Sequence, residues 1–435
     1  MNKIFFLLII SFVIVPLCLY ADDDDDIAWT HVDDNPPKKK EVEVVEITIK
    51  EKKERGPILG KKRKVEVGLL NMDAGVGNNF LTFSQVFKEK LFLDFDKLSK
   101  GLKMNLNVAV SPLYFNYNKD NIWGFGISTK AEAIGLIGIS GKMLSFTEAE
   151  KEKSDLGGAA FAEVGFPGFF HYKKFKIKAK PALYYPFAYA KSNIDYLYKN
   201  SDTAGGAETR FKVDFDFNVY TIGQFGTDKD FEITAKPGFD ICMGVEFPLS
   251  EALGLQDKFY FLNFDVGVDI VNLPIAPSTM YDYLHMTGSV GSNDPLTLDE
   301  NTDWKSLYSF DGNLAYDKKR QYVLRPFKMV TWAEWRPFGN NFIAFIPSIG
   351  FAVNLLYAKP VSVEGGIKAR LDLLKFFIVT AGTVYEDRMW KNSIALALDL
   401  RIFEFDLGVD LRSPSFAKSW SGGGAGVQLG FKFGW

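Results

Sequence analysis

Apolar and polar residues alternate one for one over most of the chain after Val65. Between residues 102 and 110, for example, Asn107 separates Leu106 from Val108. The same period of two recurs in residues 211–219, 239–247, 261–270, 394–402 and 403–411. Successive side chains of a β-strand point to opposite faces, so each segment is predicted to be a strand with one apolar and one polar face. The chain is therefore predicted to be all-β.

Two architectures produce this alternation: a soluble sandwich with its apolar faces packed together, and a membrane barrel with its apolar face toward lipid. Several segments alternate over the roughly 9–11 residues that a tilted strand needs to cross a bilayer, whereas ordinary strands average about 5–6. Their polar positions mix Asp, Asn, Lys and Gly, which suits a hydrated interior. We therefore predict a transmembrane antiparallel β-barrel of about 14–16 strands over residues 65–435.

The residues before the barrel differ from it. A basic start, an apolar run from Ile4 to Val15 and the small residue Ala21 are typical of a secretory signal peptide over residues 1–21. Cys18 leaves open the alternative of a lipid-bearing N-terminus. Residues 22–64 are rich in acids and bases and contain no Phe, so we expect a mostly disordered periplasmic segment there.

Other regions interrupt the alternation within the barrel. Residues 80–99 begin with Phe at helical spacing, which predicts a short N-terminal helix or an internal plug. Three further stretches are interpreted as outer loops, the last of which is too long for a simple turn: residues 140–158, 191–209 and 272–319.

The chain ends in an apolar strand from Val427 to Trp435. This terminus resembles that of bacterial outer-membrane β-barrel proteins, which typically close on a polar residue, a Gly and two hydrophobic positions, the last of them a C-terminal aromatic. Here these places are filled in order by Gln428, Gly430, Phe433 and Trp435. Phe is the commoner final residue in the family, so Trp departs from the pattern. The resemblance implies a barrel-assembly signal that the barrel-assembly machinery reads during insertion into outer-membrane lipid, with both termini periplasmic.

The sequence gives no sign of catalytic, metal or cofactor chemistry. His31, His171 and His285 are far apart, and no HExxH pattern occurs. The net charge of −3 is too near balance to indicate nucleic-acid binding. We expect neither enzymatic activity nor a cofactor.

The polar faces of the clearest strands carry an excess of acids. The acids predicted to face the lumen are Asp214, Asp216, Asp240, Glu246, Asp265, Asp269, Glu404, Asp406 and Asp410. Because negative charge in a narrow channel concentrates cations, we hypothesise a passive channel for small hydrophilic solutes with a mild cation preference. Two alternatives stay open: an uptake barrel for hydrophobic compounds, similar to the fatty-acid transporter barrels, and a structural barrel or adhesin that displays its loops. The sequence identifies neither the solute nor the oligomeric state.

Overall fold

The computed structural model describes residues 63–80, 101–145, 149–203, 206–225, 231–254, 261–291, 296–297, 311–315, 319–373, 376–400 and 402–435. The predicted signal peptide, almost all of the predicted periplasmic segment and nearly all of the predicted plug lie outside the described residues.

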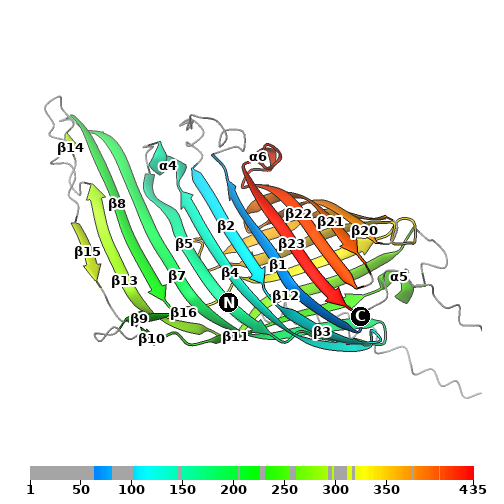
Figure 1. The fold of residues 1–435 in the computed structure, drawn as a ribbon. Coiled ribbons are helices and arrows are strands. Elements are labelled where there is room, and N and C mark those ends of the chain that lie inside the picture. The colour runs from blue at the N-terminus through cyan, green and yellow to red at the C-terminus, as the bar shows by residue number, and fades with distance from the viewer. Residues whose placement is uncertain are drawn as a thin grey trace, which may run out of the picture. The chain divides into compact units, whose positions relative to one another are not determined.

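The described chain forms a closed antiparallel barrel of 14 strands (Figure 1). Its first strand, β1 (Val65–Asn78), pairs with β2 (Leu102–Ser111) on one side and with the last strand, β23 (Gly424–Gly434), on the other. The β1–β23 pairing runs along almost the whole length of both strands, so neither strand presents a free edge at this seam. The predicted fold class and strand number are confirmed.

Some wall strands are continuous, and others consist of consecutive elements separated by a break. The other continuous strands are β4 (Trp123–Ile139), β7 (Phe175–Thr203), β18 (Ile343–Val353), β19 (Val361–Leu373), β20 (Phe377–Glu386), β21 (Met389–Asp399) and β22 (Phe403–Ser413). The interrupted strands are β2 with β3 (Tyr114–Lys119), β5 (Ala149–Gly165) with β6 (Gly168–Tyr172), β8 (Gly206–Thr221) with β11 (Gly238–Phe247), β12 (Phe264–Ala276) with β13 (Ser278–Gly291), and β15 (Asp311–Ala315) with β16 (Arg320–Val323) and β17 (Phe327–Trp335). A hairpin of β9 (Gly223–Phe225) and β10 (Phe231–Ile233) lies between β8 and β11, and β14 (Leu296–Thr297) pairs with β8.

The outer face of the wall is apolar. On β19, Val363 and Ile367 are exposed, whereas Glu364 is buried. On β22, Val409 is exposed and the adjacent Asp410 is buried. An apolar surface of this extent is unfavourable in water and favourable against lipid acyl chains. On these strands the apolar side chains therefore point outward and the polar side chains point inward, as predicted.

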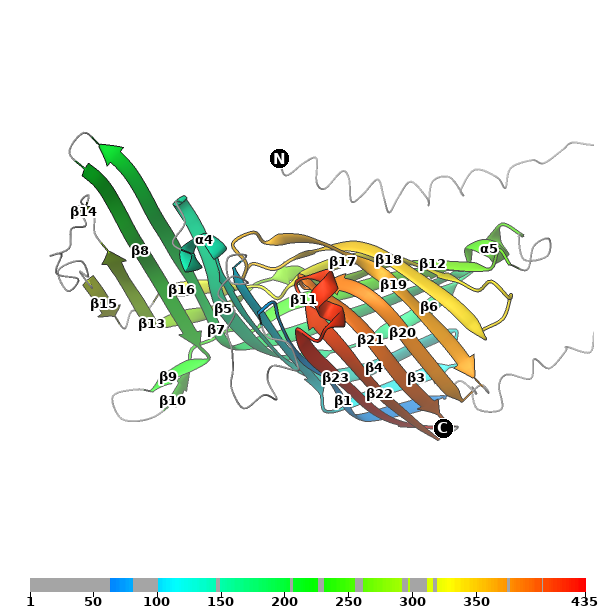
Figure 2. The same ribbon diagram turned by 90° about the horizontal axis from the view of Figure 1, so that it is seen from above.

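The wall is taller on one side. β5, β7, β8 and β13 continue past the ends of their neighbours and, with β14 and β15, form an open curved sheet that projects from the barrel (Figures 1 and 2). We call it the upper sheet, and the barrel end from which it rises the upper rim.

The interpretation of residues 140–158, 191–209 and 272–319 as loops is wrong for most of their length. β5 begins at Ala149, and β7 and β8 together occupy nearly all of residues 191–209. β12 extends to Ala276, and β13, β14 and β15 lie within residues 272–319. A sheet that projects beyond the lipid-facing band meets water on both faces, so its strands are not required to alternate, although residues 211–219 of β8 do.

Short helices cap some connections. α4 (Gly141–Leu144) and α6 (Phe416–Trp420) lie at the upper rim, and α5 (Leu249–Ala252) lies at the opposite end (Figure 1). Among the described residues, no helix has both the length and the apolar character needed to cross a membrane.

Candidate transport site in the barrel interior

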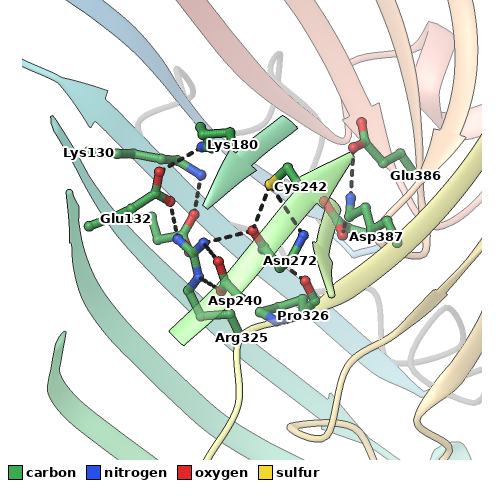
Figure 3. Close-up of polar contacts among 12 residues, drawn as sticks. Lys130, Glu132, Lys180, Asp240, Cys242, Asn272, Arg325, Pro326, Glu386 and Asp387 are labelled. Atoms are coloured by element: carbon green, nitrogen blue, oxygen red, sulfur yellow. Dashed lines mark hydrogen bonds and ion pairs between the residues drawn. The ribbon is translucent and has the colours of Figure 1, made fainter. Parts of the chain in front are cut away.

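A buried arginine extends into the barrel interior from the break between β16 and β17 (Figure 3). The side chain of Arg325 is fully buried. Arginine is rarely buried to this extent unless it has partners for its charge. Its Nε and Nη2 donate to the two carboxylate oxygens of Asp240 at 2.8 and 2.9 Å, and its Nη1 pairs with Glu163. Nη2 also donates to Asn272 Oδ1 at 2.8 Å. The bidentate pair holds the planar guanidinium in one orientation.

The partners of Arg325 come from a long arc of the wall. Glu132 on β4 lies 3.6 Å from Arg325 Nη1 and pairs with Lys130, and Lys180 Nζ on β7 donates to Glu163 Oε1 at 2.6 Å. The side chain of Arg325 therefore reaches acids on wall strands that are not its neighbours. We call this group the Arg325 cluster, and its members are Lys130, Glu132, Glu163, Lys180, Asp240, Asn272 and Arg325. Its three acids balance its three bases.

The local backbone explains why Arg325 turns inward. Pro326 has no N–H to donate to a ladder, so strand pairing is interrupted next to it. Opposite, Asn272 has a left-handed backbone with φ 54°, which Asn tolerates better than most residues. Its Nδ2 donates to the Pro326 carbonyl at 3.0 Å and thereby replaces a ladder hydrogen bond across the break.

A second ionic cluster surrounds Lys328 on β17. Lys328 Nζ lies 2.7 Å from Glu386 Oε1, 2.9 Å from Asp387 Oδ1 and 3.6 Å from Glu364 Oε1. The turn that carries Asp387 also reaches β2, because Asn105 Nδ2 donates to the Asp387 carbonyl at 3.0 Å. Side chains of the two clusters therefore extend from β17 and its break toward two different parts of the wall.

Between the Arg325 cluster and the upper rim, buried apolar side chains fill part of the interior. The buried side chains here, which we call the interior apolar cluster, are Leu136, Ala159, Phe161, Tyr184, Tyr189, Tyr220, Ala235, Met280, Val323 and Leu356. Phe161 and Tyr184 meet edge to face with ring centroids 6.0 Å apart, and the Arg325 guanidinium lies 5.2 Å from the Tyr184 ring centre. A water-filled pore has a polar lining, so this part of the interior is built differently from one.

The connection between β18 and β19, residues 354–360, folds into the mouth of the barrel, and we call it the strap. Its Leu356 is buried in the interior apolar cluster. Lys191 Nζ on β7 donates to the Leu355 carbonyl at 2.6 Å, and the Ala358 N–H donates to Asp155 Oδ1 on β5 at 2.8 Å. These contacts attach the strap to the base of the upper sheet.

Tyr357 attaches the strap to β2. Asn105 Nδ2 donates to the Tyr357 hydroxyl at 3.0 Å, and the Arg388 guanidinium lies 4.0 Å from the centre of its ring. Burial and the nearby Asp387 carboxylate raise the pKa of the Tyr357 hydroxyl above its ordinary value, because both disfavour the phenolate.

Cavities lie on both sides of the strap. The one toward the upper sheet has a volume of about 360 Å³ and is called the strap cavity. Its apolar lining includes Phe161, Tyr189, Tyr220, Leu324 and Leu356, and its polar lining is Lys191, Asn193, Asn218, Lys319, Gln321 and Asn354. Of the described residues that line it, none is an acid. A second cavity of about 410 Å³ lies on the side of Tyr357, and its polar lining includes Lys103, Asn105, Asp155, Lys359, Asp387 and Arg388.

The structure disperses the acids that the sequence analysis assigned to the lumen. Asp240 belongs to the Arg325 cluster, and Asp410 is buried against Arg412. Asp269 accepts a hydrogen bond from Trp332 Nε1 at 2.7 Å.

Other predicted acids lie beside bases toward the end opposite the upper rim. The pairs are Glu246 with Lys178 and with Lys176 at 3.4 Å, Asp265 with Arg336 at 2.5 Å, Glu404 with Lys432 at 2.6 Å, and Asp406 with Lys432 at 3.5 Å. Asp214 and Asp216 instead lie on the upper sheet, half exposed, 2.9 Å from Lys212 Nζ and 3.1 Å from His285 Nε2 respectively. Most of these acids thus have a basic neighbour, and that neighbour offsets the charge excess inferred from the strands alone.

The residues of the predicted assembly signal lie on β23 and at its end. Gln428 Nε2 lies 3.4 Å from Asp73 Oδ2 on β1, and Gly430 pairs with Asn71. Phe433 and Trp435 are exposed, Trp435 by 70 %.

The bases that organise the interior are not among the site residues predicted from the sequence. Lys176, Lys178 and Lys180 alternate with apolar residues on β7 and face the acids of β5 and β11, so this alternation could have identified a basic inner face. Arg325 carried no such signal, because it lies at a break outside any alternating segment and 162 positions from Glu163.

The fold defines the class of the protein. A closed 14-stranded antiparallel barrel with an apolar outer face and charged side chains inside is a β-barrel of the outer-membrane type. No family model and no curated protein sequence matches the chain.

Solved structures similar to the chain include outer-membrane barrels. The toluene transporter TodX of Pseudomonas putida is 8% identical, with 84% of this chain and 88% of that chain covered and a TM-score of 0.40. A TodX variant described as a monoaromatic hydrocarbon channel is 10% identical, with 85% and 88% covered and a TM-score of 0.38. The translocator domain of the autotransporter NalP from Neisseria meningitidis is 8% identical, with 85% and 88% covered and a TM-score of 0.27. At TM-scores this low the comparisons support no functional conclusion.

Proposed function

We propose that the protein is an outer-membrane uptake barrel for small apolar or amphipathic compounds, which enter at the upper rim and bind above the Arg325 cluster. The observation that carries this proposal is the interior apolar cluster, in which Phe161, Tyr189 and Tyr220 line a cavity inside the barrel. Pockets for small organic ligands typically combine such an apolar lining with a few polar groups.

The energetics favour an apolar passenger over a hydrated one. A small aromatic compound that removes about 150 Å² of apolar surface from water gains about 4 kcal/mol. A hydrated ion gains nothing from the apolar cluster, and it next meets Arg325 and Asp240, which are already paired with each other. Charges that neutralise each other also give little long-range attraction to a passing ion.

The proposed placement in the cell follows from the sequence. The predicted signal peptide and the terminal strand support export to the outer membrane, insertion by the barrel-assembly machinery, and both termini in the periplasm. The upper rim then faces outward, where it meets external compounds first.

A passive channel for hydrophilic solutes with mild cation preference is the second candidate. The charged side chains toward the end opposite the upper rim, such as Asp265 and Glu404, favour it, although Arg336 and Lys432 pair with them. A structural barrel or adhesin is favoured by the projecting upper sheet, which offers a large surface beyond the rim (Figure 2).

Uptake of labelled toluene by Gram-negative cells that produce the protein tests the first candidate. We expect faster uptake than in cells without the protein. Phe161→Asp places a charge in the interior apolar cluster and should abolish the gain, whereas the matched control Phe161→Leu should keep most of it. Heat-dependent migration in detergent gels shows which variants retain the barrel. Equal uptake with and without the folded wild-type protein refutes the proposal.

A further inference from the structure

We propose that the strap cavity binds a small organic anion with an apolar tail, and that this ligand releases the strap. The inference rests on the proposed uptake function, and it adds the charge of the ligand and the step that opens the mouth.

The charge of the ligand follows from the lining of the strap cavity. Lys191 and Lys319 line it together with four amide side chains, and no described lining residue is an acid. Arg325, by contrast, is matched by Asp240 and Glu163. A cavity with two ammonium groups and no carboxylate favours one anionic group, and the aromatic rings beneath it favour an apolar tail.

Lys191 is shared between the strap and the cavity. Its ammonium donates to the Leu355 carbonyl at 2.6 Å and also lines the cavity. A carboxylate forms stronger hydrogen bonds with an ammonium than a neutral carbonyl does. A bound anion therefore competes with Leu355 for Lys191.

Leu356 also belongs to both the strap and the lining of the strap cavity. Its side chain is 5% exposed, belongs to the interior apolar cluster and lines the cavity beside Phe161 and Tyr220. An apolar tail that covers these rings takes the position of Leu356. Head and tail of one ligand thus compete with two adjacent strap residues.

The remaining contacts determine where the strap moves. Ala358 is held by Asp155, whereas Tyr357 is held by Asn105 on the other side of the mouth. Once Leu355 and Leu356 are displaced, the strap stays attached through Ala358 and Tyr357. The strap cavity then joins the second cavity, which lies on the other side of the strap.

The test uses the full-length protein in detergent and two probes of one carbon skeleton, cinnamate and its neutral counterpart cinnamyl alcohol. Calorimetry measures binding, and hydrogen exchange with mass spectrometry measures protection of residues 354–360. We expect cinnamate to bind at least tenfold more tightly than the alcohol. We also expect saturating cinnamate to speed exchange in the strap, while exchange in β1 and β23 stays unchanged.

A pair of matched variants identifies the group that recognises the anion. Lys191→Met should weaken cinnamate binding about tenfold to a hundredfold. It should not weaken binding of the alcohol, because loss of the Lys191–Leu355 hydrogen bond only loosens the strap. Lys212→Met removes a lysine on β8 that pairs with Asp214 and does not line the cavity, so it should change neither.

Equal binding of both probes, or a strap whose exchange is unchanged or slowed by cinnamate, overturns the inference while leaving uptake of apolar compounds intact. No binding of either probe also overturns it, and the toluene experiment then decides the uptake function separately.

Discussion

Replacing Arg325 by Met removes a base that contacts Asp240, Glu163 and Glu132 together. Met has a similar reach but carries no charge, so the acids stay buried without their central partner. We expect the barrel to lose stability, because each uncompensated carboxylate keeps its desolvation cost and loses its attraction.

The magnitude can be estimated from the contacts of Arg325. Removing one partner of a buried ion pair costs about 3–5 kcal/mol. Lys180 still neutralises Glu163 at 2.6 Å, so most of the loss falls on Asp240, whose two oxygens both accept from Arg325. Adding Asp240→Asn to Arg325→Met removes the stranded charge and should recover about 1–3 kcal/mol.

Urea unfolding of the barrel in lipid vesicles measures both quantities. The matched control is Arg320→Met, which removes an exposed arginine on β16 that lies 4.9 Å from the Tyr322 ring, and it should cost about 1 kcal/mol or less. If Arg325→Met costs no more than Arg320→Met, or if Asp240→Asn worsens it, the Arg325 cluster does not hold the interior as described.

Further predictions concern the strap and the seam. The pKa of the Tyr357 hydroxyl is raised in the folded protein, so its contribution to stability is constant below about pH 10 and falls as the pH rises above that value. Urea unfolding midpoints measured against pH should show this fall. Tyr357→Phe should make the fall smaller. Leu356→Ala should speed hydrogen exchange in residues 354–360 by at least about tenfold, because it removes a buried side chain from the interior apolar cluster. An unchanged strap would show that this side chain does not anchor it. A Cβ at Gly424 would lie 2.2 Å from the Val76 carbonyl oxygen. Gly424→Ala should therefore lower the temperature at which the compact band disappears from detergent gels by several degrees. The control Gly135→Ala should leave that temperature unchanged, because its Cβ would have no neighbour closer than 3.6 Å.

The barrel itself could be predicted from the sequence because lipid imposes a simple rule on each strand. Leu106 points outward and Asn105 points inward as their alternation requires, and Val427 lies on the outer face of the closing strand. Such information is local, so a single sequence contains it.

The upper sheet and the interior could not be predicted in the same way. β7 extends to Thr203, beyond the lipid-facing band. There water contacts both faces of the strand, so its sequence is not required to alternate between apolar and polar residues. The pairing of Arg325 with Asp240 and Glu163 joins residues that are distant along the chain, and which base meets which acid depends on the curvature of the closed wall. Summing charges strand by strand therefore leaves out bases such as Arg325 and Arg336 that pair with these acids.

Planar-bilayer recording from the purified wild-type protein shows whether the barrel interior is open to ions. A barrel whose interior is occupied by the Arg325 cluster, the interior apolar cluster and the strap should show no steady ionic conductance at moderate voltage. Steady ohmic steps with a reversal potential that favours cations would contradict this account and would establish the open hydrophilic pore instead.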